Sequence, residues 1–329
     1  MIHPIPPGTR DVLPDEMREL RKLHTAMLDV FESRGYGQVA TPAIEYDEVL
    51  ARGDGRTSES AYRFFDEQGD LLALRSDMTV PIARLVASRY ADAEPPLRLC
   101  YLANAYRAVR PQRGQMREFA QAGVELIGAA APEGTAEVVE VLEAALDAAC
   151  LDRAVIGLGD ADLYRQLLTE LGVEGEARDS VLARLAKHDL VGLELELEQA
   201  GIGEREVATC VALSQLRGGR EVLEEARSLG GDAVERATAR LGETFEALEQ
   251  RGVAERVRID LGLLRDLGYY SGAILEVYDP ALGHVLGGGG RYDRLLKRFG
   301  PDLPAAGFAL YLERVHVAQM EEESRRAER

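Results

Sequence analysis

Two long extended runs, residues 97–107 and 119–127, constrain the fold more than any other feature of the sequence. A polar segment, residues 110–115, separates them and contains both a proline and a glycine. Extended runs on either side of such a segment are typical of a hairpin. Because hairpin strands run antiparallel, these residues predict an antiparallel sheet.

Helices and shorter strands are expected around this hairpin. From Pro14 onward, apolar residues recur at helical spacing as far as Phe31, and Gly35 follows, which predicts an amphipathic helix. Residues 62–65 and 71–74 flank a polar stretch containing Gly69, which indicates a second hairpin. Further strands are expected at 154–158, 257–261 and 273–278, and further helices at 132–150 and 308–320.

Residues 160–251 differ from the rest of the chain in being dense in Glu, Arg, Leu and Ala. Gly172, Gly201, Gly219 and Gly230 interrupt this stretch, which is typical of several short helices ended by glycine. We interpret it as a helical insertion. Residues 1–159 and 252–325 then form one α+β core, an antiparallel sheet flanked by helices, and residues 326–329 a frayed tail.

The composition argues against several classes of function. A formal charge of −18 disfavours binding to nucleic acid, although it does not exclude a local basic patch. No apolar run approaches the roughly 20 residues of a membrane-spanning helix, and the first nine residues lack signal-peptide character, so a cytoplasmic protein is expected. The three cysteines and five histidines show no metal-ligand spacing, so we expect neither metal nor cofactor.

A polar face on one extended run is the first candidate site. On a strand, residues two apart share a face, so Gln121 and Glu125 point one way and the apolar residues between them point the other. The same argument places Asp77 with Thr79 and puts Arg107 on the neighbouring run. These acceptors and donors suit an ammonium and a carboxylate. The alternative is a sheet face exposed to solvent.

Arg265 and Tyr270 form a second candidate, between two expected strands. A buried arginine needs an anionic partner, which a ligand carboxylate would supply. A salt bridge to Asp266 or Glu276 is the alternative. Residues 287–290 are four consecutive glycines, whose backbone is able either to approach a ligand closely or to pack against other backbone.

Four segments, residues 7–14, 107–125, 264–272 and 288–293, together resemble the catalytic core of the histidyl-tRNA synthetase family. The resemblance spans most of the chain. It implies the class II aminoacyl-tRNA synthetase fold, with a six-stranded antiparallel sheet and a dimer built partly around Pro42. It also implies a histidine site, and aligns Arg107 and Arg314 with arginines that hold ATP phosphates. The expected histidine-binding residues are Asp77, Thr79, Arg107, Gln121, Glu125, Arg265, Tyr269 and Tyr270.

Departures from the family pattern fall on the nucleotide side. Val109 replaces an acidic residue, Gln115 replaces an arginine, and Tyr311 stands where a glycine is usual. Asp77 replaces a glutamate, and no anticodon-binding domain follows. These losses resemble the paralogous regulatory subunits of ATP phosphoribosyltransferase.

That resemblance implies a non-catalytic role in the first step of histidine biosynthesis. The implied partners are a second copy of the chain and a short catalytic subunit, in a hetero-octamer that histidine feedback inhibits. A histidine-adenylating enzyme or a truncated histidyl-tRNA synthetase is the alternative.

Overall fold

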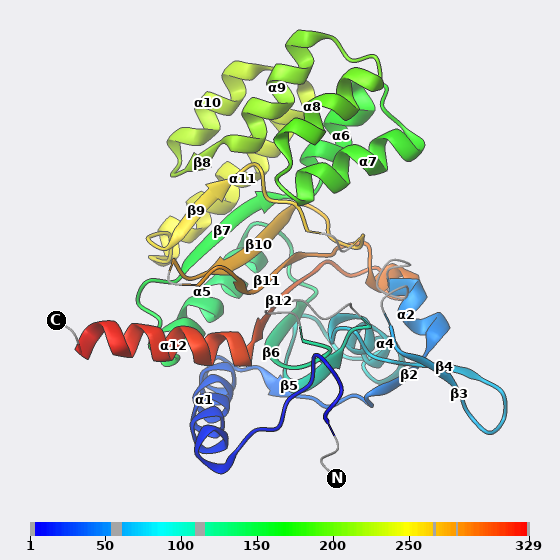
Figure 1. The fold of residues 1–329 in the computed structure, drawn as a ribbon, viewed down its shortest axis with the longest axis vertical. Helices are drawn as coiled ribbons and strands as arrows, with labels where there is room; N and C mark the ends of the chain where they lie inside the picture. The colour runs from blue at the N-terminus through cyan, green and yellow to red at the C-terminus, as the bar shows by residue number, and fades with distance from the viewer. Residues whose placement is uncertain (1–3, 54–60, 109–115, 266–267, 281, 328–329) are drawn as a thin grey trace.

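A nine-stranded sheet runs through the centre of the protein (Figure 1). The computed structural model describes residues 4–53, 61–108, 116–265, 268–280 and 282–327. In spatial order the strands are β1 (Gly37–Gln38), β5 (Leu97–Tyr106), β6 (Glu118–Ile127), β12 (Ala305–Tyr311), β11 (Val285–Arg291), β10 (Ala273–Tyr278), β7 (Val155–Asp160), β9 (Val257–Asp260) and β8 (Arg217–Gly218). The six strands from β5 to β7 run antiparallel to one another, whereas β1 beside β5 and β9 beside β7 are parallel to their neighbours. The antiparallel central sheet with its flanking helices confirms the expected α+β fold class.

The long hairpin is present as the sequence predicts. β5 pairs with β6 from Leu97 opposite Ile127 to Tyr106 opposite Glu118. Residues 109–115, which join them, lie outside the described residues. Ala122, Val124 and Leu126 belong to one hydrophobic cluster, whereas Ile127 belongs to a second cluster. The alternation of residues between the two faces of β6 is therefore confirmed.

Three helices cover the first face: α1 (Pro14–Ser33), α5 (Glu133–Ala148) and α12 (Leu312–Ala327). The expected amphipathic helix is α1, which buries Leu20, Leu23, Met27 and Phe31. The rings of Phe31 and Phe308 meet edge to face, with their centroids 5.9 Å apart, so α1 packs directly on β12.

The second face is covered by α2 (Asp47–Gly53), α4 (Thr79–Arg89) and the short η1 (Leu296–Arg298). Beside them lies a three-stranded sheet of β2 (Ile44–Tyr46), β4 (Leu71–Leu74) and β3 (Arg63–Phe65), whose hairpin projects from the body in Figure 1. Asp66 closes that hairpin by accepting hydrogen bonds from the amides of Gln68 and Asp70, both at 2.9 Å.

Six helices and the short strand β8 make up residues 161–251, at the top of Figure 1. The helices are α6 (Leu163–Glu170), α7 (Gly175–Ala186), α8 (Leu190–Gln199), α9 (Glu204–Gln215), α10 (Glu221–Leu229) and α11 (Asp232–Arg251). Helix α11 packs against both α5 and α6, and Arg240 forms a 2.8 Å ion pair with the buried Asp160 of β7. Within the described residues, no helix has the length and apolar character needed to cross a bilayer.

The expected helix at 308–320 is wrong in its first turn, because residues 308–311 belong to strand β12. Phe308 pairs with Val124 on one side and with Gly289 on the other. Pairing on both edges outweighs the helical propensity of alanine and leucine in this segment.

Two residues of the expected frayed tail, Arg326 and Ala327, belong to the last turn of a helix. Helix α12 continues through Arg326 and Ala327, and Arg326 donates hydrogen bonds to the Cys150 carbonyl at 2.9 Å and the Asp152 carboxylate at 2.6 Å. Residues 326–329 are few and mostly charged, so the sequence alone gives no indication of the contacts with Cys150 and Asp152. Residues 328–329 lie outside the described part of the chain.

Candidate functional site

A small cavity of about 30 Å³ lies on the second face of the sheet, between the sheet and α4. Seven of the eight expected site residues line it: Asp77, Thr79, Arg107, Gln121, Arg265, Tyr269 and Tyr270. The eighth, Glu125, lies directly behind this lining. We call this space the inner cavity. The segments that the sequence analysis singled out therefore converge on one place in the fold.

Asp77 and Thr79 reach the inner cavity from the start of α4. The sequence analysis placed them on an extended strand, and this is wrong, because Thr79 is the first residue of the helix. The Asp77 carboxylate accepts a hydrogen bond from the Val80 amide at 3.2 Å, which satisfies one of the free N–H groups of the first turn. The helix start, rather than strand alternation, brings both side chains to the cavity.

Gln121 and Glu125 are fixed by β6, in the centre of the sheet. They are only 3% and 1% exposed, so the alternative of a solvent-exposed polar face is excluded. The Gln121 Oε1 has no hydrogen-bond partner among the described residues. A buried acceptor without a donor is unfavourable, so this atom is suited to receive a proton donor from a ligand.

Glu125 is held between two hydroxyl groups. Thr79 donates to its Oε1 at 2.7 Å, and Tyr292 donates to its Oε2. Burial raises the pKa of Glu125 to about 8, because the two hydroxyl groups only partly offset the loss of solvation. The carboxyl occupies a hollow over Gly307, where an added Cβ would lie 2.0 Å from Oε2.

Arg265 is largely buried, with 15% of its side chain exposed. It donates to the Leu275 carbonyl at 3.3 Å, and the alternative partner Glu276 is 3.9 Å away. Its Nε has no hydrogen-bond partner among the described residues. The guanidinium fills a hollow over Gly288, where an added Cβ would lie 1.8 Å from Nη1. Asp266, the other alternative partner, lies outside the described residues.

The four glycines at 287–290 therefore serve two purposes within strand β11. At Gly287 and Gly289, an added Cβ would lie within 2.3 Å and 2.0 Å of carbonyl oxygens of β12. Close packing of backbone explains these two positions. Gly288 instead makes room for Arg265, and it is the one of these four glycines that lines the inner cavity.

Aromatic rings form much of the remaining wall. The Tyr269 ring lies 4.9 Å from Tyr270 and 6.0 Å from Tyr292, measured between centroids. The sequence analysis did not identify Tyr101 and Tyr292, which also line the cavity. Tyr292 follows the glycine run directly, and Tyr101 lies opposite Gly123 across the β5–β6 pair. A large side chain opposite a glycine is the signal that would have identified Tyr101.

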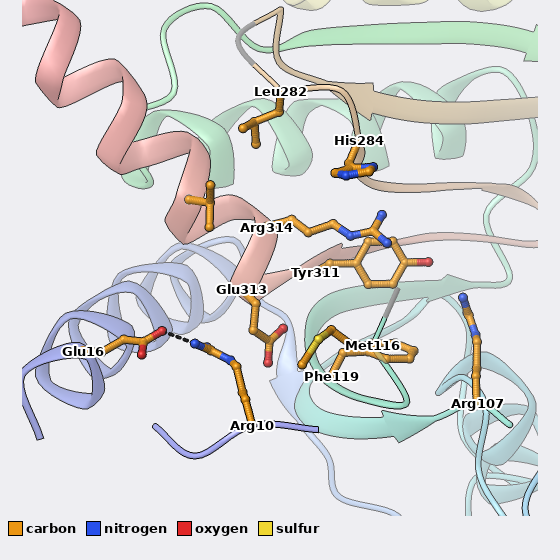
Figure 2. A pocket seen from close by; sticks show the side chains of 11 residues that line it. Arg10, Glu16, Arg107, Met116, Phe119, Leu282, His284, Tyr311, Glu313 and Arg314 are labelled. Atoms are coloured by element: carbon orange, nitrogen blue, oxygen red, sulfur yellow. Dashed lines mark hydrogen bonds and ion pairs between the residues drawn. The ribbon is translucent and has the colours of Figure 1, made fainter. Parts of the chain in front are cut away.

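A larger pocket of about 420 Å³ adjoins the inner cavity and shares Arg107 and Tyr311 with it (Figure 2). The Tyr311 ring meets Phe119 edge to face at 5.4 Å, and the Arg314 guanidinium lies 4.7 Å from the Tyr311 centroid. Tyr311 thus forms part of the wall between the two spaces and leaves the larger one open. Val109 and Gln115, the other two departures, lie outside the described residues.

The electrostatics of Tyr311 are dominated by arginine. Burial opposes ionisation of its hydroxyl, but Arg107 and Arg265 on one side and Arg314 on another outweigh it and lower the pKa of Tyr311 to about 8. Arg107 also hydrogen-bonds to this hydroxyl. Two groups with shifted pKa values are thus found here, Tyr311 in the wall between the two spaces and Glu125 behind the lining of the inner cavity, which is typical of a binding or catalytic site.

The size of the inner cavity limits what it holds in this state. About 30 Å³ is space for one or two water molecules, whereas sites for small molecules usually measure 300 Å³ or more. An amino acid enters only if lining side chains move. The described residues contain no group of three or more His, Cys, Asp or Glu side chains arranged to hold a metal ion.

Comparisons with known proteins agree with this architecture. The model of the histidyl-tRNA synthetase family matches residues 8–315. An ATP phosphoribosyltransferase regulatory subunit from Moorella thermoacetica is 42% identical over 319 residues, covering 96% of this chain and 82% of the relative.

Two solved structures have similar folds. One, from Bacillus halodurans, is described as an ATP phosphoribosyltransferase regulatory subunit/histidyl-tRNA synthetase; it has a TM-score of 0.88 and 34% identity over 97% of this chain and 84% of that one. Another, a histidine–tRNA ligase subunit from Alicyclobacillus acidocaldarius, has a TM-score of 0.87 and 31% identity over 98% of this chain and 99% of that one. The chain belongs to the histidyl-tRNA synthetase family, and three curated relatives that are 41–42% identical to it are ATP phosphoribosyltransferase regulatory subunits.

Proposed function

We propose that this chain is a non-catalytic, histidine-binding regulatory subunit of ATP phosphoribosyltransferase, a glycosyltransferase of histidine biosynthesis. In this role it assembles with a short catalytic subunit in a cytoplasmic hetero-octamer, supports catalysis by that subunit and transmits feedback inhibition by histidine. The relatives' shared name supports the regulatory role. The observation that carries the ligand assignment is the pairing of an unsatisfied acceptor, Gln121 Oε1, with an unsatisfied donor, Arg265 Nε, at one cavity.

The groups at the cavity complement free histidine part by part. Arg265 is suited to the ligand carboxylate, because a guanidinium binds carboxylates through paired hydrogen bonds. Asp77 and Thr79 are suited to the ammonium group, and Gln121 and Glu125 to the imidazole nitrogens and the ammonium. Tyr269 and Tyr270 supply aromatic walls for the ring. All the proposed contacts come from residues that line the inner cavity or lie directly behind its lining.

The small volume of the inner cavity supports regulation rather than simple storage. A cavity of about 30 Å³ excludes histidine, so binding selects or creates a second conformation in which the cavity is larger. A ligand that binds only one of two states shifts the population toward that state. If the catalytic subunit distinguishes the two states, histidine binding changes its activity.

Titration calorimetry with L-histidine tests the proposal, on the purified chain and on its complex with the short catalytic subunit. We expect heat of binding in at least the complex, and inhibition of the complex over the same concentration range. A chain that binds no histidine in either form is not a histidine sensor. D-histidine is the control ligand, because it carries the same charges in the wrong arrangement.

The alternative, a histidine-adenylating enzyme, is favoured by one specific observation. The 420 Å³ pocket beside the inner cavity is lined by Arg107, Arg314 and Phe119, and is large enough for a nucleotide. Against this, Arg107 and Tyr311 both lie against the Phe119 ring, so a base would have to displace them to stack there. Histidine-dependent exchange of pyrophosphate into ATP distinguishes the two functions: exchange supports the enzyme, and its absence supports the sensor.

A self-dimer is proposed at the three-stranded sheet. Ile44, Tyr46 and Phe64 share its outer face and are 47%, 51% and 37% exposed, next to the exposed Pro42. Exposed apolar residues that adjoin one another typically mark an interface. The Glu45 carboxylate, which alternates with them, points inward and pairs with Arg84 at 2.7 Å.

Replacing Tyr46 by arginine is expected to convert the dimer into a monomer. A two-fold interface contains each residue twice, so the substitution buries two cations against an apolar surface, and we expect the dimer dissociation constant to rise by at least 100-fold. Size-exclusion chromatography with light scattering measures the change. Val191→Arg on α8, where the side chain is 68% exposed, is the matched control and should stay dimeric.

A further inference from the structure

A separate cleft of about 540 Å³ lies between the helical segment and the core. Its described walls come from α6, α7 and the residues that follow α7 on one side, and from Leu264, Arg265 and Gly268 on the other. This volume is within the usual range for small-molecule sites. None of the residues that the sequence analysis assigned to histidine lines it except Arg265.

The cleft is basic although the protein is strongly acidic. Among the described residues, Arg165, Arg178, Lys187 and Arg265 line it, against one carboxylate, that of Asp179. The chain as a whole carries a formal charge of −18. Cations that gather in a concave, partly desolvated space raise the local concentration of anions. The local basic patch that the composition left open is therefore found here.

Two of these cations have no anionic partner within the part of the chain that the structure describes. Arg178 and Lys187 form no ion pair with another described residue. By contrast, the neighbouring Arg184 of α7 pairs with Asp189 at 2.9 Å and with Glu196 at 3.2 Å. On helix α7, Arg184 lies outside the cleft and is neutralised by carboxylates. Arg178 lies inside the cleft and has no partner carboxylate among the described residues.

The floor of the cleft supplies a second, independent observation. Arg265 lines both the cleft and the inner cavity, and its largely buried Nε has no acceptor among the described residues. Arg165 also connects the two spaces, because its Nη1 donates to the Tyr270 carbonyl at 3.0 Å. An anion in the cleft would therefore meet three further cations and a guanidinium whose Nε lacks an acceptor among the described residues.

We propose that this cleft binds a small phosphate-bearing anion with at least two negative charges. Guanidinium groups bind phosphate oxygens through paired hydrogen bonds, and the cations come from three segments, which suits two phosphate groups better than one. The acidic surface elsewhere disfavours a long polyanion such as RNA. The site shares Arg265 with the proposed histidine site but none of the other residues assigned to histidine.

Titration calorimetry with inorganic diphosphate, on the full-length chain without histidine, tests this site. We expect saturable binding to one site per chain, and weaker binding of inorganic phosphate. Arg178→Glu and Lys187→Glu should each weaken diphosphate binding by about tenfold or more, because each loses a charge-assisted contact and adds repulsion. Arg265→Gln should weaken it as well.

Arg205→Glu is the matched control. Arg205 is an exposed arginine of α9 outside the cleft, so the same change in net charge should leave diphosphate affinity within about twofold. The proposal is overturned by absence of diphosphate binding, by equal effects of Arg178→Glu and Arg205→Glu, or by a short RNA hairpin that binds more tightly than diphosphate. Because no histidine is present, a failure here is distinct from a failure of the histidine proposal.

Discussion

Arg265→Gln is expected to weaken L-histidine binding by about 30-fold or more, since it removes a charge-assisted hydrogen bond worth about 2 kcal/mol. The same change should leave folding intact. The nearest carboxylate to Arg265, that of Glu276, is 3.9 Å away, and Arg265 Nε has no hydrogen-bond partner among the described residues. A neutral side chain should therefore leave the free energy of unfolding nearly unchanged or raise it. Calorimetry gives the affinity, and thermal unfolding checks the fold.

L-Histidinol, which lacks the carboxylate, makes the Arg265 experiment specific. The wild-type chain should bind histidinol more weakly than histidine, and Arg265→Gln should bind the two ligands almost equally, because the lost interaction is the same one. Arg256→Gln is the matched control. Arg256 is similarly enclosed, with 22% of its side chain exposed, but it lies away from the cavity and pairs with Asp147. Equal losses for both ligands in Arg265→Gln would place its effect elsewhere than at the carboxylate.

Much of the fold was predictable because its signals are local. The apolar spacing from Pro14 to Phe31 predicts α1, and the two long extended runs predict the β5–β6 hairpin. The register of that hairpin was not predicted. Strand β10 was predicted with its observed bounds, 273–278. Each signal lies within about 20 consecutive residues, where helical and strand periodicities are distinct.

The errors share a different cause, which is tertiary pairing. Residues 308–311 contain alanine, leucine and aromatic residues compatible with a helix, and only the neighbours β6 and β11 make them a strand. Asp77 and Thr79 were assigned to a strand because β4 ends just before them at Leu74. A short break before a helix is difficult to recognise without the helix-capping contacts that the structure reveals.

For the site, the sequence identified the residue set but not its state. Family resemblance named eight residues, and seven line one cavity, yet nothing in the sequence shows that this cavity is nearly closed. Gly288 and Gly307 explain the closure, because the groups that fill their hollows are Arg265 and Glu125 themselves. Side chains of the proposed histidine site thus occupy space at the sheet surface that the ligand would need. On that proposal, histidine binding requires these side chains to move.

Glu125→Gln is expected to remove a large pH dependence of stability. The pKa of Glu125 is raised by burial to about 8 in the folded protein, above the 4.5 of an unfolded chain. Between these values the folded state retains a proton that the unfolded state loses, so stability falls as the pH rises. The stability that the protonated Glu125 contributes is fully present below about pH 4.5 and is lost by about pH 8. The decline amounts to roughly 5 kcal/mol in all, at about 1.4 kcal/mol per pH unit.

Urea denaturation at intervals from pH 5 to 8 measures this decline. The free energy of unfolding of Glu125→Gln should rise relative to wild type by several kcal/mol across that range, because glutamine does not ionise. The change at Tyr311, which titrates near pH 8, is common to both proteins and cancels. Glu45→Gln is the control: Glu45 is also buried but is paired with Arg84, so its loss should destabilise throughout and show no such gain.

Saturating histidine connects this titration to the proposed function. An ammonium group bound beside Glu125 favours the carboxylate, so histidine should lower the pKa of Glu125 and flatten the decline in stability between pH 5 and 8. At neutral pH, binding should then release up to one proton, which calorimetry detects as a dependence of the binding enthalpy on the buffer's ionisation enthalpy. Glu125→Gln should show no such release. A wild-type slope that histidine leaves unchanged would mean that the ligand's positive charge lies elsewhere than beside Glu125.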